Sequence, residues 1–123
     1  MNIKPKEKKK MKQTTAMVSA EKFQSSEQLW FWFLYSKSVR NDFTRMRGNP
    51  VRRPCEILDV ETLITKLYLC GKLSDEQLLV MKKFGDKRRA PHQHIYSENR
   101  AADIWARAMD TLYVAAHQRG WIE

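Results

Sequence analysis

The positions of glycine and proline constrain this chain more than any other feature of its sequence. These residues are the strongest local breakers of regular structure, so each uninterrupted segment between them can hold one helix. The segments predict four helices, over about residues 26–46, 55–70, 75–84 and 98–119. All eight breakers fall between these segments or near the chain ends: Pro5, Gly48, Pro50, Pro54, Gly71, Gly85, Pro91 and Gly120.

Apolar residues recur at helical spacing within each segment, and no segment alternates polar and apolar residues long enough to predict a strand. The last segment has the clearest pattern, an alanine-rich stripe that suits one buried helix face. Its members are Ala101, Ile104, Trp105, Ala108, Met109, Leu112, Ala115 and Ala116. We therefore predict an all-α fold, with a single compact helical domain over residues 25–123, and expect Trp121 and Ile122 to fold back onto its core.

Local signals place the ends of these helices. Two capping boxes, Ser25 to Gln28 and Ser74 to Gln77, predict where the first and third helices begin. Pro54 and Ser97 are typical first-turn and capping residues for the other two. The last three helices are each predicted to end at a left-handed glycine, namely Gly71, Gly85 and Gly120.

The chain is strongly basic, with 23 Lys and Arg against 14 Asp and Glu and a formal charge of +9. This balance favours polyanions as partners. Six lysines fall in the first twelve residues, among them Lys8, Lys9 and Lys10, and residues 1–24 are predicted to form a disordered arm. No apolar run follows the arm closely enough for a signal peptide or membrane anchor, so we expect a cytoplasmic protein.

The search for a catalytic or metal site finds no complete constellation. His92 and His94 could join Cys55 and Cys70 around zinc, but structural zinc sites usually bring cysteines in close pairs, and these two stand fifteen positions apart. Both thiols are expected to be reduced and buried. Cys55 near a helix start could have a lowered pKa, but no base is placed beside it. We predict a non-catalytic protein without metal or cofactor.

Outside the arm, positive charge is concentrated at two joints between predicted helices. Arg52 and Arg53 precede the second helix, and five cations surround the end of the third: Lys82, Lys83, Lys87, Arg88 and Arg89. Arg88 and Arg89 lie beyond the predicted helix end, where phosphate contact explains them better than the helix dipole does. The second and third helices with Gly71 between them have the outline of a helix-turn-helix, or alternatively of a plain helical hairpin.

Two stretches of the sequence together suggest a family. Residues 72–81 (KLSDEQLLVM), followed by Ser97, Ala101, residues 104–108 (IWARA) and Leu112, resemble the helical DNA-binding domains of sigma-factor region 4 and of phage antiterminators. The resemblance covers under half of the chain. It implies that Arg100, Asp103 and Arg107 face DNA while Arg88 and Arg89 bind phosphates. With the charge, it predicts a nucleic-acid-binding regulatory protein of transcription from a bacterium or phage, with DNA favoured and RNA left open.

An alternative function follows from the aromatic residues of the first helix. Trp30, Phe31 and Tyr35 lie off its apolar stripe, and Trp30 is the one tryptophan with no evident inward role. A surface of this kind is typical of a docking site. The alternative is therefore a protein-interaction adaptor, or a helical module that forms homodimers through this surface.

Overall fold

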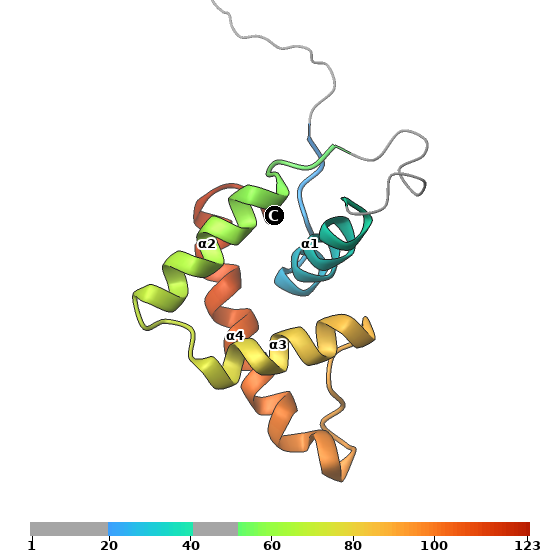
Figure 1. Cartoon of the computed structure of the whole chain (residues 1–123). Coiled ribbons are helices and arrows are strands. Elements are labelled where there is room, and N and C mark those ends of the chain that lie inside the picture. Colours follow the sequence, from blue (N-terminus) through green and yellow to red (C-terminus); the bar gives the residue numbers. More distant parts are fainter. Residues whose placement is uncertain (1–19, 41–51) are drawn as a thin grey trace, which may run out of the picture.

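The computed structural model describes residues 20–40 and 52–123 of the chain (Figure 1). Within these ranges it contains α1 (Ser26–Arg40), α2 (Ile57–Leu69), α3 (Asp75–Lys87), the 3₁₀ turn η3 (Tyr96–Glu98) and α4 (Asn99–Gln118). No strand occurs in the described ranges, so the predicted all-α fold is confirmed. The arm lysines at 8–10 and the predicted helical extension over 41–46 lie outside the described residues.

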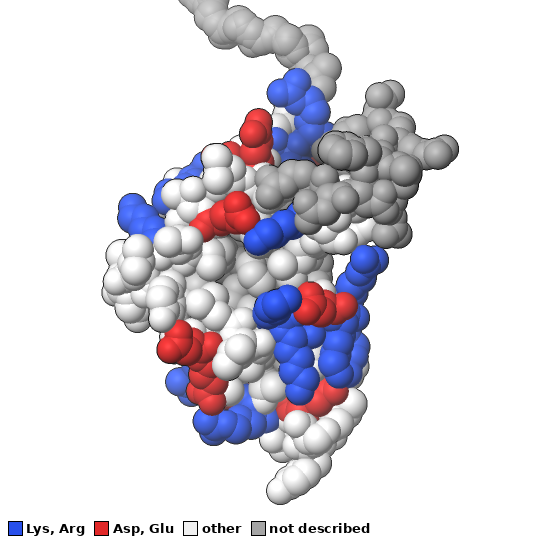
Figure 2. Space-filling view, in the orientation of Figure 1, with Lys and Arg blue, Asp and Glu red and all other residues white. Residues whose placement is uncertain are grey.

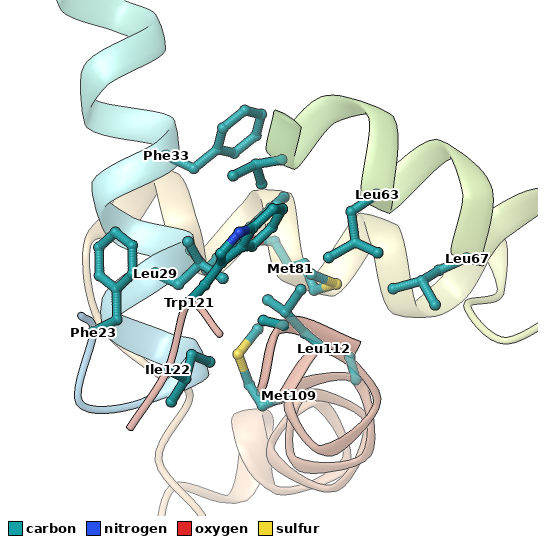
Figure 3. Close-up of a cluster of buried hydrophobic side chains, with 14 of the residues drawn as sticks. Phe23, Leu29, Phe33, Leu63, Leu67, Met81, Met109, Leu112, Trp121 and Ile122 are labelled. Carbon is teal, nitrogen blue, oxygen red and sulfur yellow. The ribbon is translucent and has the colours of Figure 1, made fainter. Parts of the chain in front are cut away.

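The helices surround one shared core. α3 packs closely on α4, and α1 contacts α2, α3 and α4. The predicted stripe of α4 faces inward, with Trp105, Ala108, Met109, Leu112 and Ala116 all buried. Figure 3 shows side chains of all four helices and of both end segments meeting in this core, including Leu29, Phe33, Leu63, Leu67, Met81, Met109, Leu112, Phe23, Trp121 and Ile122.

The folded part begins earlier than the predicted boundary at residue 25. Phe23 is fully buried and forms a parallel bridge with Ile122. Its N–H donates to the Trp121 carbonyl at 2.9 Å, and its own carbonyl accepts from the Glu123 N–H at 3.0 Å. Trp121 and Ile122 are buried as predicted. Residues 20–24 therefore belong to the domain, because backbone bonds and an apolar side chain attach them to its C-terminal end.

The predicted capping signals are formed at α3 and only in part at α1. The Ser74 hydroxyl accepts from the Gln77 N–H at 3.1 Å, and the Gln77 side chain accepts from the Ser74 N–H at 2.9 Å. At α1 the Ser25 hydroxyl accepts from the Gln28 N–H, but the Gln28 side chain accepts from the Gln24 N–H instead. In both helices a serine hydroxyl thus accepts from the N–H of the third helical residue, which has no intrahelical partner.

Glycine ends α2 and α4 as predicted. Gly71 has φ +81°, its N–H donates to the Tyr68 carbonyl, and the Lys72 N–H donates to the Leu67 carbonyl at 2.8 Å. This pair of bonds is the Schellman motif, which requires a left-handed residue that glycine adopts without strain. From this turn α2 and α3 diverge as an angled pair (Figure 1).

Gly85 does not end α3, contrary to the sequence prediction, because the helix continues to Lys87. A Cβ placed on Gly85 would collide with the Leu34 side chain and lie 2.8 Å from the Trp30 Nε1 atom. The Trp30 Nε1–H in turn donates to the Met81 carbonyl at 2.8 Å. The absence of a side chain at Gly85 thus lets α1 and α3 approach closely. Gly85 is needed for this packing and not to end the helix.

The start of α4 also differs from the prediction. Ser97 lies within η3, and Glu98 occupies the N-cap position of α4 without a side-chain cap hydrogen bond. The Glu98 carboxylate instead points back to the segment that follows α3, where it accepts hydrogen bonds from Arg89 and His92. Glu98 therefore holds the loop between α3 and α4 instead of capping the helix with its side chain.

Candidate nucleic-acid interface

Arg88 is the C-cap residue that follows the last residue of α3. It has φ +61° and is the one non-glycine residue with positive φ among the described residues. The Arg88 N–H donates to the Gly85 carbonyl at 3.0 Å, and the Arg89 N–H donates to the Phe84 carbonyl at 3.2 Å. These are the bonds that end α2 at Gly71, here formed around a residue with a side chain. The left-handed conformation costs a non-glycine residue about 1–2 kcal/mol, so an arginine at this position lowers the stability of the fold relative to glycine.

Three cations gather around one buried ring at this end of α3. The Lys83 and Lys87 Nζ atoms and the Arg89 Cζ atom each lie 5.5 Å from the centre of the Phe84 ring. Phe84 itself is only 1% exposed. We call Lys83, Lys87, Arg88 and Arg89 the basic cluster. Figure 2 shows Lys and Arg side chains concentrated over this part of α3.

Most of the other cations predicted to bind nucleic acid have carboxylate partners. Lys82 pairs with Asp86 at 3.2 Å, Arg100 with Glu76 at 3.1 Å and Arg107 with Asp103 at 3.4 Å. Lys82 and Asp86 also line a groove of about 670 Å³ between α1, α2 and α3. These pairs are well exposed and individually weak, but they reduce the net positive charge of the surfaces around them.

Lys83, Lys87 and Arg88 differ from these residues, since no carboxylate of the described chain lies within ion-pair distance of any of them. Lys83 and Lys87 stand one helical turn apart on α3. Like charges at this spacing repel and slightly destabilise a helix. The Arg88 guanidinium lies 5.3 Å from the centre of the Tyr35 ring on α1. The structure therefore brings three uncompensated cations and one exposed aromatic residue to one end of α3.

Arg53, by contrast, contacts the N-terminal segment of the domain. Its guanidinium donates to the Glu21 carbonyl at 3.1 Å and lies 4.4 Å from the centre of the Phe23 ring. The Arg52 carbonyl accepts from the Glu21 N–H at 2.8 Å. These contacts hold residues 20–24 against the segment before α2, so Arg53 has a structural role.

Arg89 completes the basic cluster but is bound by Glu98. Its two terminal nitrogens donate to the two Glu98 carboxylate oxygens at 2.9 and 2.7 Å, and the His92 N–H donates to one of these oxygens at 2.9 Å. The Arg89 hydrogen bonds, followed by that from His92, lower the pKa of Glu98 to about 2. Glu98 thus closes the loop between α3 and α4 as an ionised carboxylate.

The Glu98 contacts predict a specific acid sensitivity. Because its folded-state pKa lies near 2 and the ordinary value is 4.5, the stabilisation from this carboxylate is complete above about pH 4.5 and disappears as the pH falls through 2. The melting temperature of Glu98→Gln should therefore lie below that of the unchanged protein at pH 6 and approach it at pH 2. A difference that stays the same at both pH values would contradict the role of the charge.

The aromatic surface expected on α1 is largely buried. Trp30 is 5% exposed, with its indole N–H bonded to the Met81 carbonyl, so the prediction that it lacks an inward role is wrong. Phe31 stacks on Trp105 with ring centres 5.7 Å apart. Only Tyr35 of the three is well exposed. The reason is that α1 is packed on several sides, by α2, α3 and α4, and therefore buries more than one stripe.

Cys55 is not activated, and neither cysteine belongs to a metal-binding group among the described residues. Cys55 is buried, and burial, followed by the charge of Asp59, raises its pKa to about 12, which is opposite to the shift expected at a helix start. Cys70 is exposed rather than buried, and neither thiol forms a disulfide. No group of three His, Cys, Asp or Glu side chains in the described ranges is arranged to hold a metal ion.

The comparisons with known proteins add no family to these observations. Neither the protein-family models, nor the curated proteins, nor the solved structures gave a match to this chain. Among the helices that the structure describes, none is long and apolar enough to cross a membrane.

Proposed function

We propose that this protein binds nucleic acid through the basic cluster, with DNA as the favoured partner and a regulatory rather than catalytic role. The observation that carries the proposal is the group of three cations at one end of α3, Lys83, Lys87 and Arg88, for which no described residue supplies a carboxylate partner. Phosphates are the counter-charges that such groups recognise, and they supply most of the affinity of DNA-binding proteins.

Two features support this use of the cluster. Lys83 and Lys87 repel one another in the free protein, so an anion that bridges them relieves an unfavourable interaction. Arg88 holds a strained backbone conformation at which glycine would be the default, and strain of this kind is concentrated at functional sites. The lysine-rich first nineteen residues carry a formal charge of +5, which adds attraction without sequence preference.

The proposal does not place the primary contact on the face of α4 that the family resemblance suggested. Arg100 and Arg107 are each paired with an acidic neighbour in the free protein. Binding DNA there would require these pairs to be exchanged for phosphate contacts. We therefore assign the primary contact to the end of α3, and expect changes at Arg107 to affect binding less than changes at Lys83 or Lys87.

The alternative function is docking of a protein partner on α1, but most of the aromatic surface that it would use is buried. Trp30 is buried and Phe31 is stacked on the core residue Trp105. Tyr35 remains exposed, but its ring lies against Arg88, which is a member of the basic cluster. An exposed aromatic residue beside cations is as typical of nucleic-acid binding as of protein docking, so Tyr35 favours neither alternative.

A salt-dependent binding assay with the full-length chain tests the proposal. The double variant Lys83→Ala/Lys87→Ala should bind labelled duplex DNA at least about ten-fold more weakly, and its plot of log affinity against log salt should be shallower by about two, since each lost phosphate contact removes about 0.9 from the slope. The control is Lys66→Ala/Lys72→Ala, which removes the same charge from α2 and the turn that follows it. Equal losses in both variants would contradict a localised site.

Arg88→Gly provides a second arm of this test. Glycine accepts φ +61° without strain, so unfolding in urea should show the variant to be as stable as the unchanged protein or more stable by up to about 1 kcal/mol. Its affinity for DNA should nevertheless fall. A variant that gains stability and keeps full affinity would remove Arg88 from the site.

A further inference from the structure

The most exposed large apolar side chain among the described residues lies in the loop that follows the basic cluster, and its ring has no packing role in the fold. The Tyr96 side chain makes no hydrogen bond, ring contact or ion pair with any described residue, and the residue is 91% exposed. It stands in η3, where the loop from α3 turns into α4 at the lower end of the view in Figure 1. Its neighbour Ile95 is also exposed.

The backbone beneath this ring is firmly held. Glu98 binds the Arg89 guanidinium through both oxygens and also accepts from the His92 N–H. The Ile95 N–H donates to the His92 carbonyl at 3.2 Å, and the Glu98 N–H donates to the Ile95 carbonyl at 2.8 Å. The loop is thus tied at its beginning, middle and end. Because the backbone is already held, binding through this ring requires no further ordering of the loop.

Arg89 connects this ring to the proposed phosphate site. Its guanidinium lies beside the Phe84 ring together with Lys83 and Lys87, and it is paired with Glu98, two residues after Tyr96. The Arg89–Glu98 pair therefore ties the segment that carries the exposed ring to the end of α3 that carries the cations. Proteins that bind single strands combine these two elements: cations along the backbone and aromatic rings on which bases stack.

We propose that Tyr96 stacks on an unpaired base of a single-stranded nucleic acid whose phosphates lie on Lys83, Lys87 and Arg88. The inference rests on the proposed function and specifies its ligand. In a duplex the faces of the bases are covered by their neighbours, so the ring has no base to stack on except at an end or a distortion. The ring then contributes to single-strand affinity, whereas the cations contribute to the affinity for both forms.

The test compares a labelled single strand of about twelve nucleotides, a length within the usual site sizes, with a longer labelled duplex that carries the same sequence, fully paired, in its middle. Tyr96→Ala should bind the single strand about ten-fold more weakly and the duplex unchanged, and Tyr96→Trp should restore single-strand binding because the larger ring stacks equally well. Tyr113→Ala is the control, since Tyr113 is a partly exposed ring on α4 that stacks on His117. Circular dichroism verifies that each variant is folded.

The outcomes separate this inference from the proposed function. If Tyr96→Ala leaves single-strand affinity unchanged, or weakens both forms equally, stacking by Tyr96 is overturned while the effect of Lys83→Ala/Lys87→Ala still supports the phosphate site. If the lysine variant loses no affinity for either form, the proposed function itself fails. A loss in Tyr96→Trp as large as in Tyr96→Ala would also overturn stacking, because that variant keeps an aromatic ring.

Discussion

Replacing Trp105 with alanine is expected to lower the free energy of unfolding by about 3–5 kcal/mol, the usual cost of removing a large buried aromatic residue. Trp105 is 3% exposed, stacks on Phe31 of α1 and meets Phe84 of α3 edge-on. A single residue of α4 thus contacts two other helices. Domains of this size are stable by about 5–15 kcal/mol in total, so the variant should be close to unfolding in urea denaturation followed by circular dichroism.

Trp105→Phe provides the control for this prediction. It keeps most of the apolar contact but removes the indole N–H, which donates to the Glu27 carboxylate at 2.6 Å. A hydrogen bond to a charged group contributes about 1.5–3 kcal/mol, so phenylalanine should cost less than alanine. If both variants lose the same stability, the bond to Glu27 rather than the packing between the helices dominates, and the packing argument is wrong.

The sequence predicted the elements of this fold because their signals are local. The α4 stripe, the capping box at Ser74 and the glycines that end α2 and α4 each depend on residues within a few positions of one another. The helix end predicted at Gly85 was wrong, because a glycine is needed there for contact with residues that are distant in the sequence. Gly85 faces Leu34 and Trp30, more than fifty positions earlier, and no local pattern reports that distance.

Phe23 and Trp30 were misplaced for the same reason. Phe23 follows a polar, lysine-rich stretch, yet it is covered by the C-terminal residues Trp121 and Ile122. Trp30 lies off the main stripe of α1, but α3 crosses above it and supplies an acceptor for its indole N–H. Burial of both residues depends on which segments meet in space, and this is a tertiary property.

The positive charge of the candidate site could be predicted from the sequence, but the ion pairs between its cations and nearby carboxylates could not. The sequence identified the cations from Lys82 to Arg89, since composition alone shows where Lys and Arg are concentrated. It did not show that Lys82 and Arg89 are bound by Asp86 and Glu98, whereas no carboxylate among the described residues pairs with Lys83, Lys87 or Arg88. The left-handed Arg88 also had no sequence signal, because arginine is not the residue that usually ends a helix in this way.

Gly85→Ala is expected to destabilise the protein by about 1–3 kcal/mol, the range for overpacked interiors. The sign is informative, because the same change inside an exposed helix stabilises by about 0.5–1 kcal/mol. Here the new methyl group meets the Leu34 side chain and the Trp30 indole, whose nitrogen is already held by the Met81 carbonyl. Urea unfolding of the two proteins under identical conditions measures the difference.

A double-mutant cycle with Leu34→Ala separates the close helix approach from other effects of the added methyl group. Leu34 is the neighbour that can move, since the contact involves the end of a flexible side chain, whereas the Trp30 ring is held by its hydrogen bond. Leu34→Ala should therefore cost less stability in the Gly85→Ala background than in the unchanged protein, with a coupling of about 0.5–3 kcal/mol. Independent, additive effects, or a Gly85→Ala variant that is more stable, would mean that α1 and α3 do not approach as closely at Gly85 as this structure requires.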